Sequence, residues 1–157
     1  EEGKIGSITP ANWNKTIAVN LTGTFNMCNL VVSAMKERQF GRIVNISSTA
    51  GQRGEPGHSH YAASKGGIIA FTKSIAVELI PFGIRVNCVA PGWVRTDMVA
   101  CVLRSRKRVR EILDLLPRGT IASPEEIAGS IIFLASGMAE HVVGEVLNVN
   151  GGSVLCG

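Results

Sequence analysis

Tyr61 and Lys65 stand four positions apart in the run YAASK, and together they could transfer a proton. On a helix, side chains at this spacing lie on the same face, one turn apart. A phenol ionises at about pH 10, too high for an efficient proton donor at neutral pH, but a neighbouring ammonium group favours the phenolate. The pair therefore predicts a general acid–base, although such spacing alone also arises by chance on amphipathic helices.

Two further polar residues are candidates for the same site. Ser48 follows a β-branched run and lies 13 positions before Tyr61. Asn20 stands in the middle of an amphipathic stretch, where asparagine has a poor helix propensity.

The periodicity of the apolar residues predicts alternating helices and strands. We expect helices at residues 11–38, 61–80 and 125–135, and strands at residues 42–47, 84–89 and 145–149. Residues 51–57, with three glycines and a proline, are expected to form a loop. Ser123 before Pro124 and Glu126 predicts the start of the last helix. The alternation predicts an α/β fold with a parallel sheet and right-handed crossovers.

Ligands of open parallel sheets bind beyond the carboxyl ends of the strands. Three polar or glycine-rich features fall at such ends: Ser47-Ser48, Pro91-Gly92 and Asn150-Gly151-Gly152. The sequence therefore places the site at this edge of the sheet.

Five motifs then occur in order: VNLTG, GRIVNISS, YAASK, IRVNCVAPGWVRTDM and GEVLNVNGG. Together they resemble the short-chain dehydrogenase/reductase family over essentially the whole chain. The resemblance implies a doubly wound, parallel-sheet Rossmann fold. Residues 1–157 would form a single partial domain of it, the C-terminal part with the last three strands. It also implies an NAD(P)-dependent oxidoreductase that reduces a carbonyl to a secondary alcohol.

The resemblance implies a role for each candidate residue. Tyr61 would be the general acid, and Ser48 would orient and polarise the substrate carbonyl. Lys65 would assist Tyr61 and bind the nicotinamide ribose, while Asn20 would hold a water that links Lys65 to solvent. The other cofactor contacts that the resemblance implies are Pro91, Gly92, Val94 and Thr96.

The glycine-rich turn TGxxxGxG, with which this family binds the cofactor's diphosphate, does not occur in the sequence, and neither does its NNAG motif. We therefore expect the first four strands, on the order of 90 residues, to lie outside this chain. The choice between NAD and NADP is normally made there, so either cofactor is expected, with NADP preferred. The chain alone is expected to be catalytically silent and marginally stable, because strand 42–47 would lack a neighbour.

Residues 95–122 occupy the place of the family's substrate lid. Five cations gather there: Arg104, Arg106, Lys107, Arg108 and Arg110. They form either a solvated helix face or a surface that attracts a phosphate-bearing or acidic carrier, such as acyl-CoA or acyl carrier protein.

Within the family, the chain resembles most the bacterial 3-oxoacyl-(acyl-carrier-protein) reductases and acetoacetyl-CoA reductases. This implies a 3-oxoacyl thioester substrate and a role in fatty acid biosynthesis. Sugar and polyol dehydrogenases share most of the motifs and are the alternative.

The resemblance also implies a homodimer or homotetramer, because in this family the helices around Asn20 and after Tyr61 pack against their copies. An alternative of another class is a catalytically silent oligomerisation module. The complete set of Asn20, Ser48, Tyr61 and Lys65 argues against that alternative. His58 and His60, near Tyr61, are expected to be solvated loop residues.

Composition argues against several other classes of protein. The 157 residues are 45% hydrophobic and 18% charged, which predicts one packed core rather than disorder. No apolar run long enough to span a membrane and no secretory signal are evident, so we expect a cytoplasmic location and no membrane partner. Four separated cysteines without a CxxC pair predict free thiols and no metal site. The net charge of +4 comes without a nucleic-acid-binding module, so no nucleic-acid partner is expected.

Overall fold

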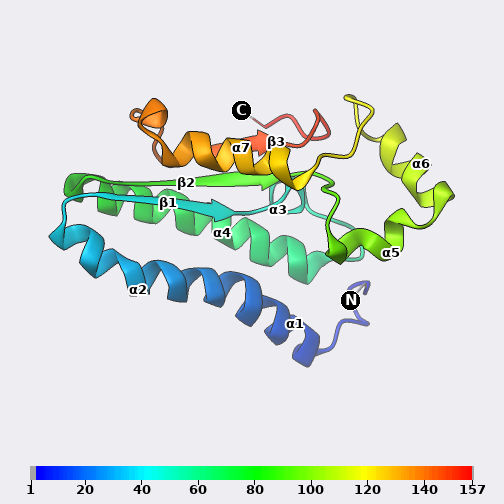
Figure 1. Ribbon diagram of the computed structural model, residues 1–157. Helices are drawn as coiled ribbons and strands as arrows, with labels where there is room; N and C mark the ends of the chain where they lie inside the picture. The colour runs from blue at the N-terminus through cyan, green and yellow to red at the C-terminus, as the bar shows by residue number, and fades with distance from the viewer. Residues whose placement is uncertain (1–2, 157) are drawn as a thin grey trace.

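Three parallel strands form the centre of the molecule (Figure 1). The computed structural model describes residues 3–156. The strands are β1 (Gly41–Ile46), β2 (Ile84–Pro91) and β3 (Val146–Val149), and β2 lies between the other two. Both pairings are parallel, with Gly41 opposite Ile84 and Cys88 opposite Val146. The prediction of an α/β fold with three parallel strands is therefore confirmed.

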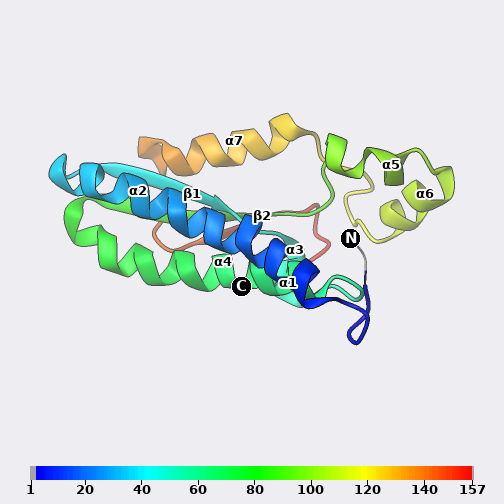
Figure 2. The same cartoon turned by 90° about the horizontal axis from the view of Figure 1, so that it is seen from below.

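Helices cover both faces of this sheet, as Figures 1 and 2 show. One face carries α4 (Ser59–Leu79) and a long helix beside it. The long helix consists of α1 (Pro10–Ile17), the π-helical turn η1 (Ala18–Thr22) and α2 (Gly23–Glu37). The other face carries α7 (Pro124–Ala135). Short 3-10 turns, η2 (Ile80–Phe82) and η4 (Gly137–Ala139), follow α4 and α7.

The two faces each contribute an apolar core. Between α4 and the sheet, the buried members are Ala76, Leu79, Ile84 and Val86. Between α7 and the sheet, they are Val89, Ile127, Leu134 and Ala139. All eight residues of β2 are buried, as expected for a central parallel strand that is covered on both sides.

Helix α7 begins where the sequence predicts. The Ser123 hydroxyl accepts a hydrogen bond from the Glu126 amide, and the Glu126 carboxylate accepts one from the Ser123 amide. Pro124 occupies the first turn, where its missing N–H costs nothing. This reciprocal cap fixes the point at which the chain leaves the lid region and returns to the sheet.

The lid region forms a small satellite at one end of the molecule. It contains η3 (Asp97–Val99), α5 (Ala100–Leu103) and α6 (Arg106–Asp114). A core of its own, made of Ile112, Leu116 and Ile121, holds it together. Figure 1 shows α5 and α6 beyond the carboxyl ends of the strands, the edge at which the sequence places the site.

Three local expectations need correction. The helix predicted at residues 11–38 is interrupted by the π-helical turn η1, a feature that apolar periodicity does not reveal. Part of the predicted loop at residues 51–57 is helical, because α3 spans Thr49–Arg53 with Ser48 as its N-cap. The third is the expectation that no run is long and apolar enough to span a membrane. The helical segment Pro10–Glu37 is, by length and composition alone, with a mean hydropathy of 1.2, which by itself is weak evidence for a membrane span. Only 6% of its most apolar window is buried in the described chain, so much of this apolar surface is uncovered.

Candidate active site

Lys65 is fixed at the carboxyl end of β1. Its ammonium nitrogen donates a hydrogen bond of 2.9 Å to the carbonyl oxygen of Ile46, and its own carbonyl accepts one of 2.8 Å from the Ser47 hydroxyl. The same ammonium lies 5.8 Å from the centre of the Tyr61 ring. Burial lowers the pKa of Lys65 below its ordinary value, and the negative charge of a Cys88 thiolate would act in the opposite direction. Lys65 and Tyr61 therefore share one helix face, with the ammonium between the ring and the strand end.

Ser48 enters the site at the turn from β1 into α3. Its side chain is half-buried, and its hydroxyl caps α3 by accepting a hydrogen bond of 3.2 Å from the Ala50 amide. Ser47, by contrast, is buried and bonded to the backbone of Lys65. Of the two serines, Ser48 is thus the more accessible to a ligand.

Helix α3 is pressed against α4 at Gly51. A Cβ atom there would lie 2.6 Å from the carbonyl carbon of Lys65 and 2.7 Å from the nitrogen of Gly66. Both are backbone atoms inside α4, so this approach requires glycine. The contact sets how far Ser48, at the start of α3, lies from Lys65. Sequence reasoning missed this role, since it assigned Gly51 to a loop.

Asn20 reaches α4 from the π-helical turn. The Gly23 amide bonds to the carbonyl of Ala18, five residues back, which is the hydrogen bond of a π-helix. The Asn20 side-chain amide donates a hydrogen bond of 3.0 Å to the hydroxyl of Ser64. Ser64, which the sequence analysis did not single out, is fully buried in α4 between Tyr61 and Lys65.

The predicted cofactor contacts follow the end of β2. Pro91 is the last residue of β2, and the Gly92 amide bonds to the carbonyl of Val149 at 3.1 Å. Val94 forms an isolated parallel bridge with Ala122, and Thr96 is exposed just before the lid helices. These residues therefore line the same edge of the sheet as Ser48.

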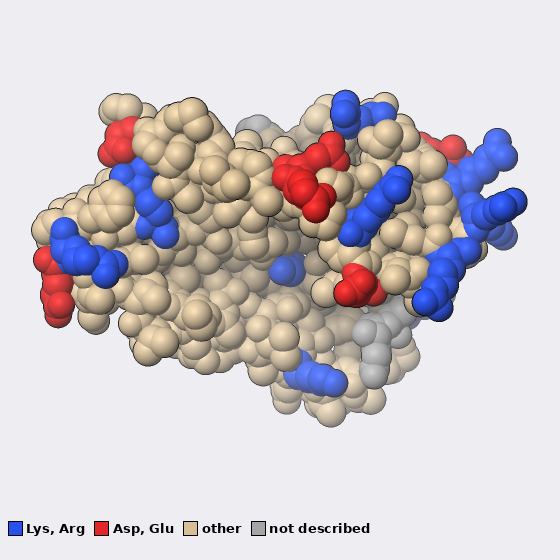
Figure 3. Space-filling model, in the orientation of Figure 1, with Lys and Arg blue, Asp and Glu red and all other residues tan. Residues whose placement is uncertain are grey.

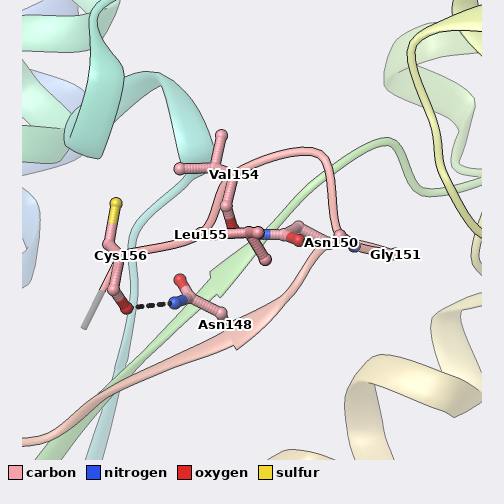
Figure 4. Close-up of a pocket in the computed structure, with 7 residues that line it drawn as sticks. Asn148, Asn150, Gly151, Val154, Leu155 and Cys156 are labelled. Carbon is pink, nitrogen blue, oxygen red and sulfur yellow. Dashed lines mark hydrogen bonds between the residues drawn. The ribbon is translucent and has the colours of Figure 1, made fainter.

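The end of β3 completes this edge. A cavity of about 370 Å³ lies there (Figure 4), lined by Asn148, Asn150, Gly151, Gly152, Val154, Leu155 and Cys156. Asn150 holds the turn after β3, because its side chain donates to the Val154 carbonyl and accepts from the Gly152 amide, both at 2.9 Å. Gln52 of α3 donates a hydrogen bond of 2.6 Å to Asn148, which ties the Ser48 turn to β3. Nothing in the sequence pattern pointed to Gln52.

Within residues 3–156, the predicted set is not joined by one continuous hydrogen-bond network. No hydrogen bond there links Ser48 to Tyr61, or Asn20 to Lys65. His60 was expected to be a solvated loop residue but is buried in the first turn of α4, with 4% of its surface exposed. In the same part of the chain, no group of three or more His, Cys, Asp or Glu side chains could hold a metal ion.

Beneath Lys65, buried polar groups join α4 to the sheet. The Asn45 side chain donates a hydrogen bond of 2.9 Å to the Thr72 hydroxyl and accepts a weak one from the Cys28 thiol at 3.6 Å. Cys88 is fully buried beside them, and burial raises the pKa of its thiol to about 11. This environment keeps the Cys88 thiol neutral near physiological pH.

Comparison with known proteins now defines the class. Residues 1–154 match the family model described as enoyl-(acyl carrier protein) reductase. The acetoacetyl-CoA reductase of Shinella zoogloeoides is 44% identical over 145 residues, which are 92% of this chain and 60% of that protein. The chain belongs to the short-chain dehydrogenase/reductase family of oxidoreductases.

Solved structures agree with this assignment. A gluconate 5-dehydrogenase from Burkholderia cenocepacia, in complex with NADP and tartrate, superposes with a TM-score of 0.94 at 30% identity, over 98% of this chain and 60% of that one. A 3-oxoacyl-(acyl carrier protein) reductase from Brucella melitensis gives 0.92 at 40% identity, over 98% and 57%. The chain therefore has the fold of part of a short-chain dehydrogenase/reductase and spans about three fifths of these relatives. The sequence-based prediction of a partial Rossmann fold of this family is confirmed.

Proposed function

We propose that this chain carries the catalytic side chains of an NAD(P)-dependent reductase that converts a 3-oxoacyl thioester into its secondary alcohol. The observation that carries the proposal is the placement of Lys65. Its partly desolvated ammonium lies between the Ile46 carbonyl and the Tyr61 ring, at the edge where parallel sheets bind ligands.

In this proposal, each predicted residue acts on the substrate carbonyl or on its proton supply. Tyr61 donates the proton to the carbonyl oxygen, and Lys65 favours the phenolate that remains. Ser48 donates a hydrogen bond to the same oxygen from the turn after β1. Asn20 holds a water that leads from Lys65 to solvent. The cofactor, when bound, supplies the hydride.

The described residues fit the nicotinamide end of such a cofactor. Pro91, Gly92, Val94 and Thr96 follow the end of β2 at the edge that Tyr61 and Lys65 share. The glycine-rich diphosphate turn does not occur in this sequence, so the chain's own contribution lies at the nicotinamide and its ribose. The NADP complex of the gluconate 5-dehydrogenase supports NADP as the preferred cofactor of the two.

The basic lid supports a thioester whose carrier is anionic. Arg104, Arg106, Lys107, Arg108 and Arg110 are all exposed. Figure 3 shows Lys and Arg side chains gathered at the end of the molecule where α6 lies. Three of these cations occupy the first turn of α6, where they oppose the positive end of the helix dipole. An anion bound there would offset that repulsion, and phosphates of CoA or of a carrier-protein arm are such anions.

Two other functions are supported by particular observations. The gluconate 5-dehydrogenase has the higher TM-score of the two structures compared, which supports a sugar-acid substrate. Its lower sequence identity, 30% against 40%, and the basic lid favour the thioester. The uncovered apolar face of the long helix supports an oligomerisation module, without excluding catalysis by the same chain.

That apolar face also supports our proposal of a homodimer or homotetramer. Val19, Met27 and Leu30 are exposed by 68%, 64% and 76% of their surface. Phe25 of α2 makes an edge-on contact with Phe71 of α4, with 6.2 Å between ring centres, so both helices contribute to one surface. Packing against a second copy would remove this apolar area from water.

The test of the function is a hybrid reductase in which this chain replaces the matching segment of the Shinella zoogloeoides acetoacetyl-CoA reductase. We expect the hybrid to oxidise NADPH in the presence of acetoacetyl-CoA and to be inactive towards gluconate with NADP. Tyr61→Phe should lower kcat roughly 100-fold or more, as loss of a general acid does. A hybrid that melts cooperatively but reduces acetoacetyl-CoA no faster than its Tyr61→Phe variant refutes the proposal.

The same hybrid tests the role of the lid. Arg108 pairs with Glu111 at 3.1 Å, so the neutralised cations should be Arg104, Arg106 and Arg110. Changing these three to glutamine should raise KM for acetoacetyl-CoA and weaken its dependence on salt, while kcat stays the same. The matched control changes three exposed cations outside the lid to glutamine, namely Lys15, Arg38 and Lys73. An equal change in KM in both triple variants would assign the effect to net charge rather than to the lid.

A further inference from the structure

The Ser64 hydroxyl stands between Asn20 and Tyr61 in a two-bond chain. It accepts a hydrogen bond from the Asn20 side-chain amide at 3.0 Å and donates one to the Tyr61 carbonyl at 2.7 Å. A hydroxyl has only one proton to donate, so both bonds point the same way: Asn20 donates to Ser64, and Ser64 donates to Tyr61. Linked hydrogen bonds of this kind strengthen one another in a buried setting.

The surroundings of Ser64 show how these two hydrogen bonds hold the start of α4 in place. Ser64 has no exposed surface, so its hydroxyl has no access to bulk water. The neighbouring Lys65 is held from the other side by the strand, through Ile46 and Ser47. The first turns of α4 are thus fixed on one side by β1 and on the other by the π-helical turn.

The π-helical turn explains how Asn20 reaches this position. Widening one turn shifts the helix register by one residue, and such turns are frequent at functional sites. The carbonyl of Asn20 is also engaged, since it accepts a hydrogen bond of 2.7 Å from the Thr24 hydroxyl. Both the backbone and the side chain of Asn20 therefore make hydrogen bonds that stabilise the π-helical turn.

We propose that Ser64 is a positioning residue, which transmits the π-helical turn at Asn20 to the turn of α4 that carries Tyr61 and so fixes the orientation of the Tyr61 ring. The inference rests on the proposed function, because it assigns Ser64 a purpose only if Tyr61 reacts. It gives Asn20 a second task besides holding a water. Ser64 itself touches neither substrate nor cofactor.

Tyr61 is the single tyrosine of the chain, which makes a direct measurement possible. In the 157-residue chain with an isotope-labelled tyrosine ring, only Tyr61 gives ring signals in the nuclear magnetic resonance spectrum. We expect Ser64→Ala and Asn20→Ala each to move these signals. The double variant should match either single variant, because both break one chain of bonds. Amide protection in residues 18–23 should fall roughly fivefold, the factor for one lost hydrogen bond.

The matched control is Ser74→Ala. Ser74 is an exposed serine of the same helix, and its hydroxyl bonds only within the helix, to the Ala70 carbonyl at 3.1 Å. It should leave the Tyr61 ring signals unchanged.

Unchanged Tyr61 ring signals in a folded Ser64→Ala chain would overturn the inference. If Ser64→Ala fails to fold, Asn20→Ala decides by the same criterion, since it removes the donor without altering α4. The ring signals do not depend on turnover. A shifted ring with an inactive hybrid reductase would therefore refute the proposed function alone, and an unshifted ring with an active hybrid would refute the role of Ser64 alone.

Discussion

Replacing Gly51 with alanine tests whether α3 fixes the distance between Ser48 and α4. The new Cβ would lie 2.6 Å from the Lys65 carbonyl carbon, whereas ordinary contacts begin at 3.4 Å. The two backbones would have to separate by much of that difference, because neither atom belongs to a flexible side chain. Overpacking costs about 1–3 kcal/mol, and the better helix propensity of alanine returns up to about 1 kcal/mol. The midpoint of these ranges, a net loss of about 1.5 kcal/mol, lowers Tm by roughly 3–6 °C in a chain of this size.

The assay is urea unfolding followed by tryptophan fluorescence, with Gly129→Ala as the control. Gly129 lies inside α7, and a Cβ there meets nothing within 4 Å. That change should therefore stabilise the chain by about 0.5–1 kcal/mol. In the hybrid reductase, Gly51→Ala should also lower kcat, because Ser48 moves with α3. A Gly51→Ala chain as stable as the wild type would show that α3 does not press on α4 as described.

Other predictions concern the thiols and the cap of α7. At pH 8, a thiol reagent should modify the exposed Cys101 and Cys156 rapidly and the buried Cys28 and Cys88 only after unfolding; four fast thiols in the folded chain would contradict the described burial. Burial raises the pKa of Cys88 from 9.0 to about 11. The unfolded thiol therefore ionises first, and stability should fall by roughly 2–3 kcal/mol as pH rises from about 9 to 11. Cys88→Ala should flatten this decline and Cys101→Ala should not. Equal slopes in the wild type and both variants would assign the decline in stability to other titrating groups. Ser123→Ala should cost about 1 kcal/mol of the free energy of unfolding, measured with urea, and a cost near zero would mean that the cap is replaced by water.

The sequence predicted the sheet and its site edge well because those features follow from local chemistry. The apolar run after Gly83 predicts a strand that is covered on both sides, and β2 is buried throughout. The β-branched run before Ser48 predicts a second strand, and β1 forms there with part of its surface exposed. The carboxyl ends of parallel strands meet at one edge, so Ser48 and Pro91 had to lie near each other. Tyr61 and Lys65 share a helix face by spacing alone.

What the sequence could not predict depends on contacts between distant segments. The π-helical turn at Asn20 is stabilised from α4, through Ser64, and leaves no trace in the apolar periodicity. The glycine at position 51 looked like a loop signal, whereas its purpose is a close approach of two helices. His60 was placed in a solvated loop because α4 begins two residues earlier than periodicity indicated.

The most direct test of the site is the titration of Lys65, followed by nuclear magnetic resonance of its side-chain amino group and assigned through its loss in Lys65→Arg. Desolvation between the Ile46 carbonyl and the Tyr61 ring should place its pKa below the ordinary value of 10.5. That result would show that the ammonium occupies the position from which it can act on Tyr61. A pKa at or above 10.5 would mean that Lys65 extends into water, and the arrangement on which the proposed catalysis rests would not exist.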